Sequence, residues 1–136
     1  MAYFKDAVEF QKIIGGFFDG LIIDTNIKPK LLESGLIIQF QYKDPALTIT
    51  IDCTKDPVVL SYNDMEKKPI VEMSMSSDIA HKFWHGKVNL VMALTRRQMV
   101  AKGPIPKILK LLPVIKPAYA LYPEYLKKIG RAELIV

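Results

Sequence analysis

Three side chains of this sequence have types and spacing that could hold a metal ion. Asp78, His81 and His85 are separated by three and four positions, so in a helix they would lie on one face, as zinc ligands often do. The ends of such a helix explain two of them without a metal. Asp78 suits the N-terminus, where a carboxylate is favoured, and His85 suits the C-terminus, where a protonated imidazole is favoured. No fourth ligand stands nearby in the sequence, so we predict neither a metal site nor a bound cofactor.

The sequence gives little support to a catalytic nucleophile. Both histidines lie in that one short segment, which leaves Cys53 without a general base at a recognisable spacing. Asp52 precedes Cys53 and does not favour a thiolate, so we interpret this cysteine as a structural thiol. A single cysteine allows no intramolecular disulfide and indicates a reducing compartment. We therefore expect a protein that is not an enzyme, with catalysis by one of the acidic residues scattered over residues 1–81 as an open alternative.

Charge is distributed unevenly along the chain. Residues 1–81 carry 8 Lys/Arg and 12 Asp/Glu, a balance of −4, whereas residues 82–136 carry 11 and 2, a balance of +9. A basic half of this kind indicates either an anionic partner, such as a membrane surface contacted transiently, or a solvated face. Tyr119, Tyr122 and Tyr125 lie near basic residues and could stack on nucleic acid bases, but packing of the last helix explains them more simply. Binding of nucleic acid or of an anionic surface is therefore the third interpretation, behind the two developed below.

Length and composition indicate a single domain. A chain of 136 residues can bury a substantial core, and fractions of 50% hydrophobic and 24% charged residues are those of a folded protein. The longest apolar runs, such as Leu90 to Leu94, are far shorter than the ~18 residues of a membrane-spanning helix. The N-terminal segment contains acidic residues and no continuous apolar run, unlike a signal peptide. We expect one domain over residues 1–136, located in the cytoplasm.

The first half of the sequence predicts two helices followed by four strands. One amphipathic helix is expected over residues 3–14, weakened at Gly15 and Gly16, and a second from about residue 24 to Gly35. Alternation of apolar and polar residues then predicts strands in four segments linked by short turns. These segments are residues 36–42, 47–52, 58–62 and 70–75. Strands joined so closely predict an antiparallel meander with one buried face.

The second half predicts helices on either side of one more strand. Ser76 or Ser77 is expected to cap a helix that ends before Gly86. A helix over residues 88–95 follows and is apolar on nearly all sides, which predicts burial on more than one of them. Residues 98–102 are too few for a helix before the next Gly-Pro pair and predict a fifth strand.

After Gly103 and Pro104 the sequence predicts the helices that close the fold. An apolar stripe at i, i+3, i+4 and i+7 is typical of a helix packed on a core. The stripe consists of Ile105, Ile108, Leu109 and Leu112. Residues 114–136 contain three tyrosines at helical spacing and are expected to form one or two short helices as a closing segment. The elements together predict an α+β fold.

This order of elements resembles the sterol carrier protein type 2 domain over about residues 25–115. The marks of the resemblance are the succession of strands, the capped helix at Ser77 to His85 with its Gly86-Lys87 corner, the apolar helix through Met92-Ala93-Leu94, the strand Met99 to Lys102 and the break at Gly103. The resemblance implies a lipid carrier with a five-stranded, mainly antiparallel sheet. About five helices would cover one face of that sheet, with an apolar tunnel for a fatty acyl chain, acyl-CoA or a sterol between the layers.

Two features depart from the family pattern. The C-terminus, Glu133-Leu134-Ile135-Val136, is not the S-K-L type of peroxisomal address found on eukaryotic members, so import into peroxisomes is not expected. The tail after Pro113 is longer than the usual closing helix, which leaves room for a different lid over the tunnel.

Alternation and family position predict nine apolar residues on the tunnel wall. They are Phe40, Ile49, Met73, Phe83, Val91, Leu94, Met99, Ile105 and Leu109. Methionine suits such a wall because its unbranched side chain adapts to ligands of different shape. Each of these residues could instead belong to a plain core, since cores and pockets share the same composition. Arg96 and Arg97 are expected to hold an anionic headgroup or a CoA phosphate beside the helix that starts at Gly103-Pro104.

The sequence therefore predicts a protein that binds an apolar ligand, and by the same means transfers it, without catalysis. The ligand would be a fatty acid, an acyl-CoA or a sterol-like lipid, admitted when the helices after Gly103 open. The alternative is a structural or interaction subunit that has the same fold but no ligand tunnel. The residues carry no signal for a particular oligomeric state.

Overall fold

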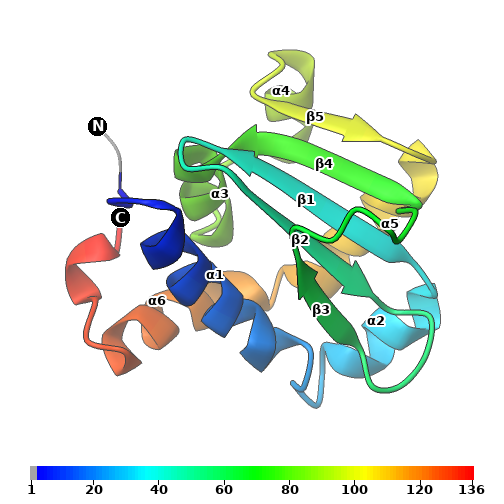
Figure 1. The fold of residues 1–136 in the computed structure, drawn as a ribbon, viewed down its shortest axis with the longest axis horizontal. Helices are drawn as coiled ribbons and strands as arrows, with labels where there is room; N and C mark the ends of the chain where they lie inside the picture. The colour runs from blue at the N-terminus through cyan, green and yellow to red at the C-terminus, as the bar shows by residue number, and fades with distance from the viewer. Residues whose placement is uncertain (1–2) are drawn as a thin grey trace.

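A five-stranded sheet with helices over one face is the frame of the molecule (Figure 1). The computed structural model describes residues 3–136, apart from the side chain of Ile105, and within that range forms six α-helices. In chain order the elements are α1 (Ala7–Leu21), α2 (Lys28–Ser34), β1 (Ile37–Lys43), β2 (Leu47–Asp52), β3 (Val59–Tyr62), β4 (Val71–Ser76), α3 (Ser77–Trp84), α4 (Leu90–Thr95), β5 (Met99–Lys102), α5 (Ile105–Ile115), α6 (Ala118–Lys128) and the 3₁₀ turn η1 (Ala132–Leu134). The predicted α+β class is confirmed.

The strand order β3-β2-β1-β4-β5 corrects the predicted meander at one position. β1, β2 and β3 are antiparallel neighbours as expected, and β5 is antiparallel to β4. β4, however, pairs in parallel with β1, with Ile38 opposite Val71 and Lys43 opposite Ser76. The connection over residues 63–70 makes this possible, because it crosses β2 and β1 on the viewer's side in Figure 1. β4 thereby lies between two other strands, where its apolar side chains are buried more completely than they would be at an edge.

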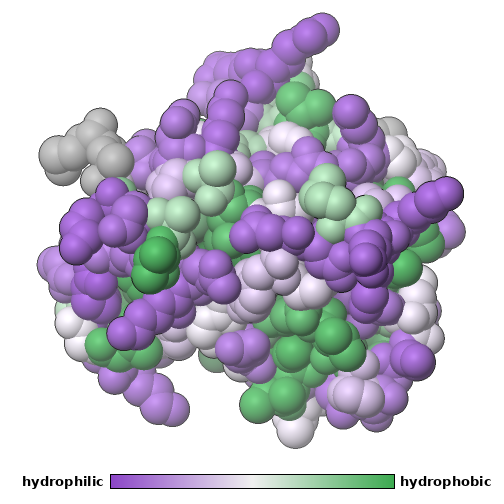
Figure 2. Space-filling view, viewed as in Figure 1, coloured by the Kyte–Doolittle hydropathy of each residue, from purple (hydrophilic) through white to green (hydrophobic). Residues whose placement is uncertain are grey.

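The two faces of the sheet follow the alternation of the sequence. Ile38, Phe40 and Tyr42 of β1 are buried toward the helices. Gln39 and its neighbour Thr50 on β2 face the other way, yet both are buried, and the Gln39 amide donates to the Thr50 hydroxyl at 3.2 Å. Figure 2 shows this second face as mostly hydrophilic, with hydrophobic side chains gathered over β3 and the adjacent end of α1. The helices therefore cover only the apolar face.

The first helix is shifted and longer than the predicted residues 3–14. Asp6 caps its N-terminus, where the carboxylate accepts a hydrogen bond from the backbone N–H of Glu9 at 2.9 Å. The helix then continues through Gly15 and Gly16 to Leu21. None of the helices in the described part of the chain has the length and apolar character that crossing a bilayer requires.

Close contact with two tyrosines explains why α1 carries a pair of glycines. A Cβ atom at Gly15 would collide with the hydroxyl of Tyr62 on β3, and one at Gly16 would collide with the hydroxyl of Tyr125 on α6. The Tyr125 hydroxyl also donates to the backbone carbonyl of Ile13 at 2.8 Å. The glycines thus let α1 approach both neighbours, so the predicted weak point of the helix is a site of close packing.

The helices after the sheet agree with the prediction in position but not everywhere in burial. Ser76 caps α3 as predicted, since its hydroxyl accepts from the Ile79 N–H at 3.2 Å, and Gly86 follows the helix with a φ of 73°. α4 is not buried on several sides: Val91 and Met92 are 60% and 44% exposed. A helix of six residues buries a second face only where a further element packs on that face. No described element packs on the exposed face of α4.

The imidazole of His81 joins three separate segments of the helical layer. It is fully buried, and its Nε2 lies 2.6 Å from the carbonyl oxygen of Leu134, so Nε2 carries the proton and donates. Its Nδ1 then accepts from the hydroxyl of Tyr122 on α6 at 2.8 Å. The neutral imidazole is thereby fully hydrogen-bonded, and burial lowers the pKa of His81 to about 4. His81 therefore holds α3, α6 and the C-terminal turn together.

The two other candidate metal ligands also have structural partners. The carboxylate of Asp78 accepts from the backbone N–H of Tyr3 at 3.0 Å, and Nδ1 of His85 lies 2.8 Å from the carbonyl oxygen of His81. Within residues 3–136, no three His, Cys, Asp or Glu side chains gather as a metal-binding group.

The two helical glycines Gly16 and Gly20 give a matched test of this packing. We expect Gly16→Ala to lower the free energy of unfolding by about 1 kcal/mol, because the new methyl group collides with Tyr125 and this outweighs the gain in helix propensity. Gly20→Ala meets no atom within 4 Å and should raise stability by up to about 1 kcal/mol. Urea denaturation of both variants measures the difference, and equal effects would contradict the proposed contact.

The buried imidazole predicts a pH dependence of stability. Because the folded-state pKa of His81 is about 4 and its unfolded value is near 6.5, the unfolded chain binds the proton more readily between these two pH values. Stability is then fully present above pH 6.5 and is lost as the pH falls toward 4. We expect unfolding free energy to drop by about 2 kcal/mol from this group between pH 7 and pH 5.

Urea denaturation at the two pH values measures this drop, and His81→Gln should remove it. His85→Gln is the control, because it retains the buried imidazole of His81 and should retain most of the pH dependence. A His81→Gln protein with the same pH dependence as the parent chain would show that the proton is bound elsewhere.

Candidate functional site

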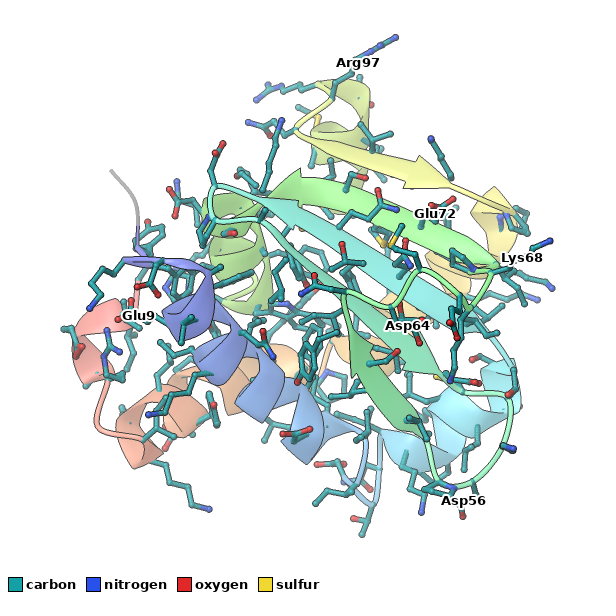
Figure 3. All side chains as sticks on the ribbon, viewed as in Figure 1. Glu9, Asp56, Asp64, Lys68, Glu72 and Arg97 are labelled. Carbon is teal, nitrogen blue, oxygen red and sulfur yellow. The ribbon has the colours of Figure 1, made fainter. Side chains whose placement is uncertain are left out.

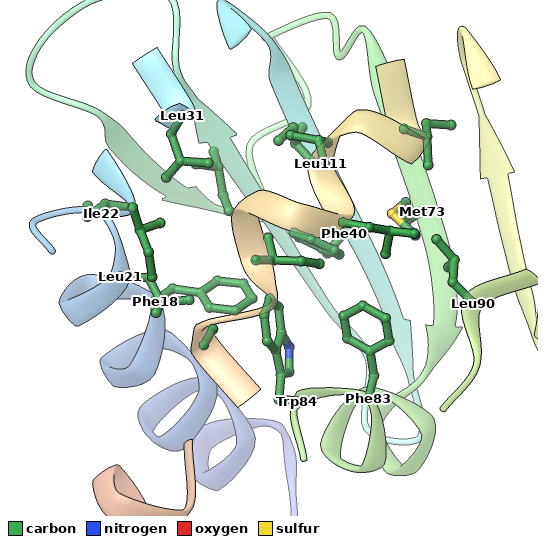
Figure 4. Close-up of a pocket in the computed structure, with 17 residues that line it drawn as sticks. Phe18, Leu21, Ile22, Leu31, Phe40, Met73, Phe83, Trp84, Leu90 and Leu111 are labelled. Carbon is green, nitrogen blue, oxygen red and sulfur yellow. The ribbon is translucent and has the colours of Figure 1, made fainter. Parts of the chain in front are cut away.

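An apolar cavity of about 50 Å³ lies between the sheet and the helices that cover it (Figure 4). The strands provide its floor, chiefly Ile38, Phe40 and Met73. The remaining wall comes from α1 to α5, from Ile22 and Ile27 in the connection between α1 and α2, and from the first residue of α6. The cavity thus lies where the two layers of the fold meet.

The chemistry of the wall is almost entirely that of hydrocarbon. No charged side chain lines the cavity in the described part of the chain. The one N–H group is the indole of Trp84, whose ring packs against Phe18 and Phe83 with centroids 5.3 and 5.2 Å away. A charged or strongly polar group inside this space would lose its hydration without gaining a partner. The arrangement therefore suits an apolar ligand and offers no group for acid–base or nucleophilic chemistry.

Three of the nine predicted wall residues line the cavity, and two more are buried beside it. Phe40, Met73 and Phe83 lie on the wall, and Figure 4 shows their side chains directed into it. Ile49 and Met99 are buried, with exposed fractions of 0% and 1%, but belong to the core beside the cavity. The sequence alternation placed these two residues on the correct face of the sheet without fixing their distance from the cavity.

The predicted wall residues on the later helices need correction. Val91 on α4 and Leu109 on α5 are 60% and 43% exposed and lie outside the cavity. Leu94 is half-buried against the core and also does not line it. The side chain of Ile105 lies outside the described part of the structure.

The error at Leu109 is one of helix phase. A second set of apolar residues on α5 has the same i, i+3, i+4, i+7 spacing, displaced along the sequence from the predicted stripe. This set lines the cavity and consists of Ile108, Leu111, Leu112 and Ile115. Both stripes share Ile108 and Leu112, so periodicity alone could not choose between them. Phe18, Leu21 and Trp84 were also missed as wall residues, since nothing in the sequence pattern separates them from ordinary core.

Arg96 and Arg97 are not beside the start of α5, where the sequence predicted an anion site. They directly follow α4 and precede β5, whereas Gly103 and Pro104 come after β5, so the strand separates the two pairs. Figure 3 shows Arg97 extending away from the sheet at this end of the molecule. The predicted position of both arginines beside the start of α5 is therefore corrected, and their binding of an anion stays a prediction.

Helix α5 is attached to the rest of the fold by apolar side chains. In the described structure, no hydrogen bond or ion pair links residues 104–117 to an element outside that segment and the adjoining start of α6. Pro113 within α5 also lacks the N–H that would bond to the carbonyl of Leu109. By contrast, α6 is fixed by the hydroxyls of Tyr122 and Tyr125. The cavity therefore has one wall that is held without directional bonds.

Two surface grooves flank α5 and share residues with the cavity. Leu111 lines both the cavity and a groove against α2, and Leu112 lines both the cavity and a groove against α4. One layer of α5 side chains therefore separates the interior from each groove.

The remaining candidate groups are not available for chemistry at the cavity. Cys53 is fully buried, and burial raises the pKa of its thiol to about 12, in agreement with a structural thiol. Tyr122 is buried and Tyr119 and Tyr125 are half-buried, so these rings do not form the exposed stacking surface that nucleic acid bases require.

The SCP-2 sterol transfer family matches residues 23–116 of this chain. No curated protein matches it closely enough to count as a relative.

Solved structures show the same fold at low sequence identity. The sterol carrier protein domain 2 of Helicoverpa armigera superposes with a TM-score of 0.65 and 19% identity, covering 80% of this chain and 89% of that one. Sterol carrier protein 2 from Yarrowia lipolytica gives a TM-score of 0.66 and 16% identity, covering 88% and 98%. The ubiquinone synthesis protein UbiJ-SCP2 gives 0.59 and 12%, covering 87% and 95%. The likeness extends over nearly the whole length of each.

Proposed function

The chain belongs to the SCP-2 sterol transfer family, and from this premise we propose that it binds an apolar lipid between its sheet and α5 and releases it again without chemical change. The observation that carries the proposal is the hydrocarbon wall of the cavity, which has no charged group among the described residues. Binding of sterols and other lipids is the general activity of the family. A fatty acid, an acyl-CoA and a sterol-like lipid are the candidate ligands for this chain.

Binding of such a ligand requires the cavity to grow. Its volume of about 50 Å³ compares with roughly 300–1,000 Å³ for sites that enclose small-molecule ligands. We propose that α5 moves outward, because the contacts holding it are apolar and a lipid chain can replace them. Each methylene buried by the ligand contributes about 0.8 kcal/mol, so a long chain can offset the contacts that α5 gives up. Phe40, Met73 and Phe83 would then contact the ligand from the side that stays fixed.

A second candidate function rests on the same small volume. A cavity of about 50 Å³ is also what a subunit would have if it kept this fold but had lost the ligand. Native mass spectrometry of the purified chain separates the two functions. Copurifying lipid favours the carrier, whereas an empty chain that associates stably with another protein favours the subunit.

The single tryptophan gives a direct test of lipid binding. Trp84 is the only tryptophan in the sequence and lines the cavity, so its emission reports on what occupies that space. We expect dibromostearate to quench this emission in a saturable manner, because bromine quenches only at close range, while stearate does not. If stearate also fails to compete with dibromostearate, the quenching does not arise from a common site and the carrier proposal is contradicted.

Adjacent residues of α5 give a matched test of the cavity wall. Ile108 is 2% exposed and lines the cavity, whereas Leu109 is 43% exposed and does not. Ile108→Asn should weaken binding of a fluorescent fatty acid by about tenfold, because a polar group inside the wall costs about 1–3 kcal/mol. Leu109→Asn should leave affinity within about twofold.

Circular dichroism and thermal unfolding establish that both variants are folded before their affinities are compared. Met73→Gln repeats the test from the sheet, in case the Ile108 variant unfolds. Equal affinities for the Ile108 and Leu109 variants would place the ligand elsewhere.

A further inference from the structure

A basic groove lies between α2 and α5. It has a volume of about 420 Å³ and is lined by Lys30, Glu33 and Ser34 of α2 and by Lys107, Lys110 and Leu111 of α5, among others. The two α5 lysines are three positions apart, so they project from neighbouring turns of one helix face. Positively charged side chains therefore line both walls of the groove.

The three lysines carry charge that the fold does not neutralise. All are exposed, and none forms an ion pair within the described residues. Glu33 is the one acidic side chain on the groove, which leaves its lining with a net charge of +2. The groove on the other side of α5, between α4 and α5, has a single charged residue, Lys116. An anion is thus attracted more strongly to the α2 side of the helix.

The basic groove and the apolar cavity meet at one side chain. Leu111 lines both spaces and is 8% exposed. Leu111 is therefore a side chain that separates the groove from the cavity, and the three lysines lie on the groove side of it.

We propose that this groove is the site for the anionic end of a single-chain amphiphile, held by Lys30, Lys107 and Lys110 while the alkyl chain passes Leu111 into the cavity. The inference rests on the proposed lipid-binding function and adds the ligand class and the side of access. A carboxylate or phosphate could not follow the chain inward, because the described residues of the cavity wall include no cation and a single side-chain N–H group. In the groove the same anion keeps water and gains charge-assisted hydrogen bonds.

The test compares alkyl chains of equal length that differ in their end group. Palmitate and hexadecyl phosphate carry the two anions to be distinguished, hexadecanol is neutral and hexadecyltrimethylammonium is cationic. Binding of each ligand is followed by its displacement of dibromostearate, which restores the emission of Trp84. The titrations are made at low ionic strength, where exposed charges are least screened. The variant is Lys30→Gln/Lys107→Gln/Lys110→Gln.

A control variant removes the same number of charges elsewhere. Lys82→Gln/Lys127→Gln/Lys128→Gln lies on α3 and α6, and none of these lysines lines the groove or the cavity. Both variants change the net charge from +5 to +2, so a non-specific effect of charge would appear equally in each.

We expect the parent chain to bind the two anions more tightly than hexadecanol and hexadecyltrimethylammonium most weakly. The groove variant should lose about tenfold in affinity for the anions, with less than about a twofold change for hexadecanol. The control variant should bind all four ligands as the parent does. A larger loss for hexadecyl phosphate than for palmitate identifies a phosphate site, and the reverse identifies a carboxylate site.

Two results overturn the inference while leaving the lipid carrier intact. They are equal affinity of the parent chain for palmitate and hexadecanol, and equal loss of anion affinity in the groove and control variants. Failure of the parent chain to bind any of the four ligands would instead overturn the proposed function, and this inference with it.

Discussion

The apolar face of the sheet has to be covered, and the cover is attached in two physically different ways. On one side, the imidazole of His81 bonds to Tyr122 and to the carbonyl of Leu134, and the hydroxyl of Tyr125 bonds to the carbonyl of Ile13. Such bonds are directional and, when buried, expensive to break, so they fix α3, α6 and the C-terminal turn against α1. On the other side, α5 is held by side chains such as Ile108 and Leu111, whose contacts have no preferred partner.

This difference in attachment determines which wall of the cavity can move outward. A close-packed interior with a cavity of only about 50 Å³ cannot accept a long chain unless an element is displaced. Displacing α3 or α6 would leave buried polar atoms without partners, whereas displacing α5 exchanges one set of apolar contacts for another. Pro113 further weakens α5 by removing one of its own backbone hydrogen bonds. The hydrogen bonds of α3 and α6 thus hold the wall around Trp84 in place. In the described part of the chain, α5 has no such bonds to other elements and is the part of the wall that can be displaced.

Local sequence signals predicted the elements well and failed where distant segments meet. The alternation in β1 and β2 and the cap at Ser76 depend on neighbours in the chain, and all were confirmed. The parallel pairing of β4 with β1, the tyrosine contacts at Gly15 and Gly16 and the burial of His81 depend on residues far away in sequence. The cavity was predicted in part. Composition indicated an apolar wall, but the residues of α5 that line it depend on which side of that helix faces the sheet.

The orientation of α5 also determines where lysines from the basic second half of the chain gather. When Ile108 and Leu111 face the cavity, Lys107 and Lys110 face α2. Lys30 lies on that helix. The same helix contacts the β2–β3 connection through the ion pair of Lys28 with Asp56 at 3.0 Å. An anion bound between Lys30 and the two α5 lysines would bridge α2 and α5. A ligand whose chain pushes α5 outward therefore also supplies, through its end group, an attraction that draws α5 back over that chain. A neutral lipid would supply only the first of these forces, so the proposed selectivity for anionic amphiphiles would follow from the attachment of α5 rather than from any polar group inside the cavity.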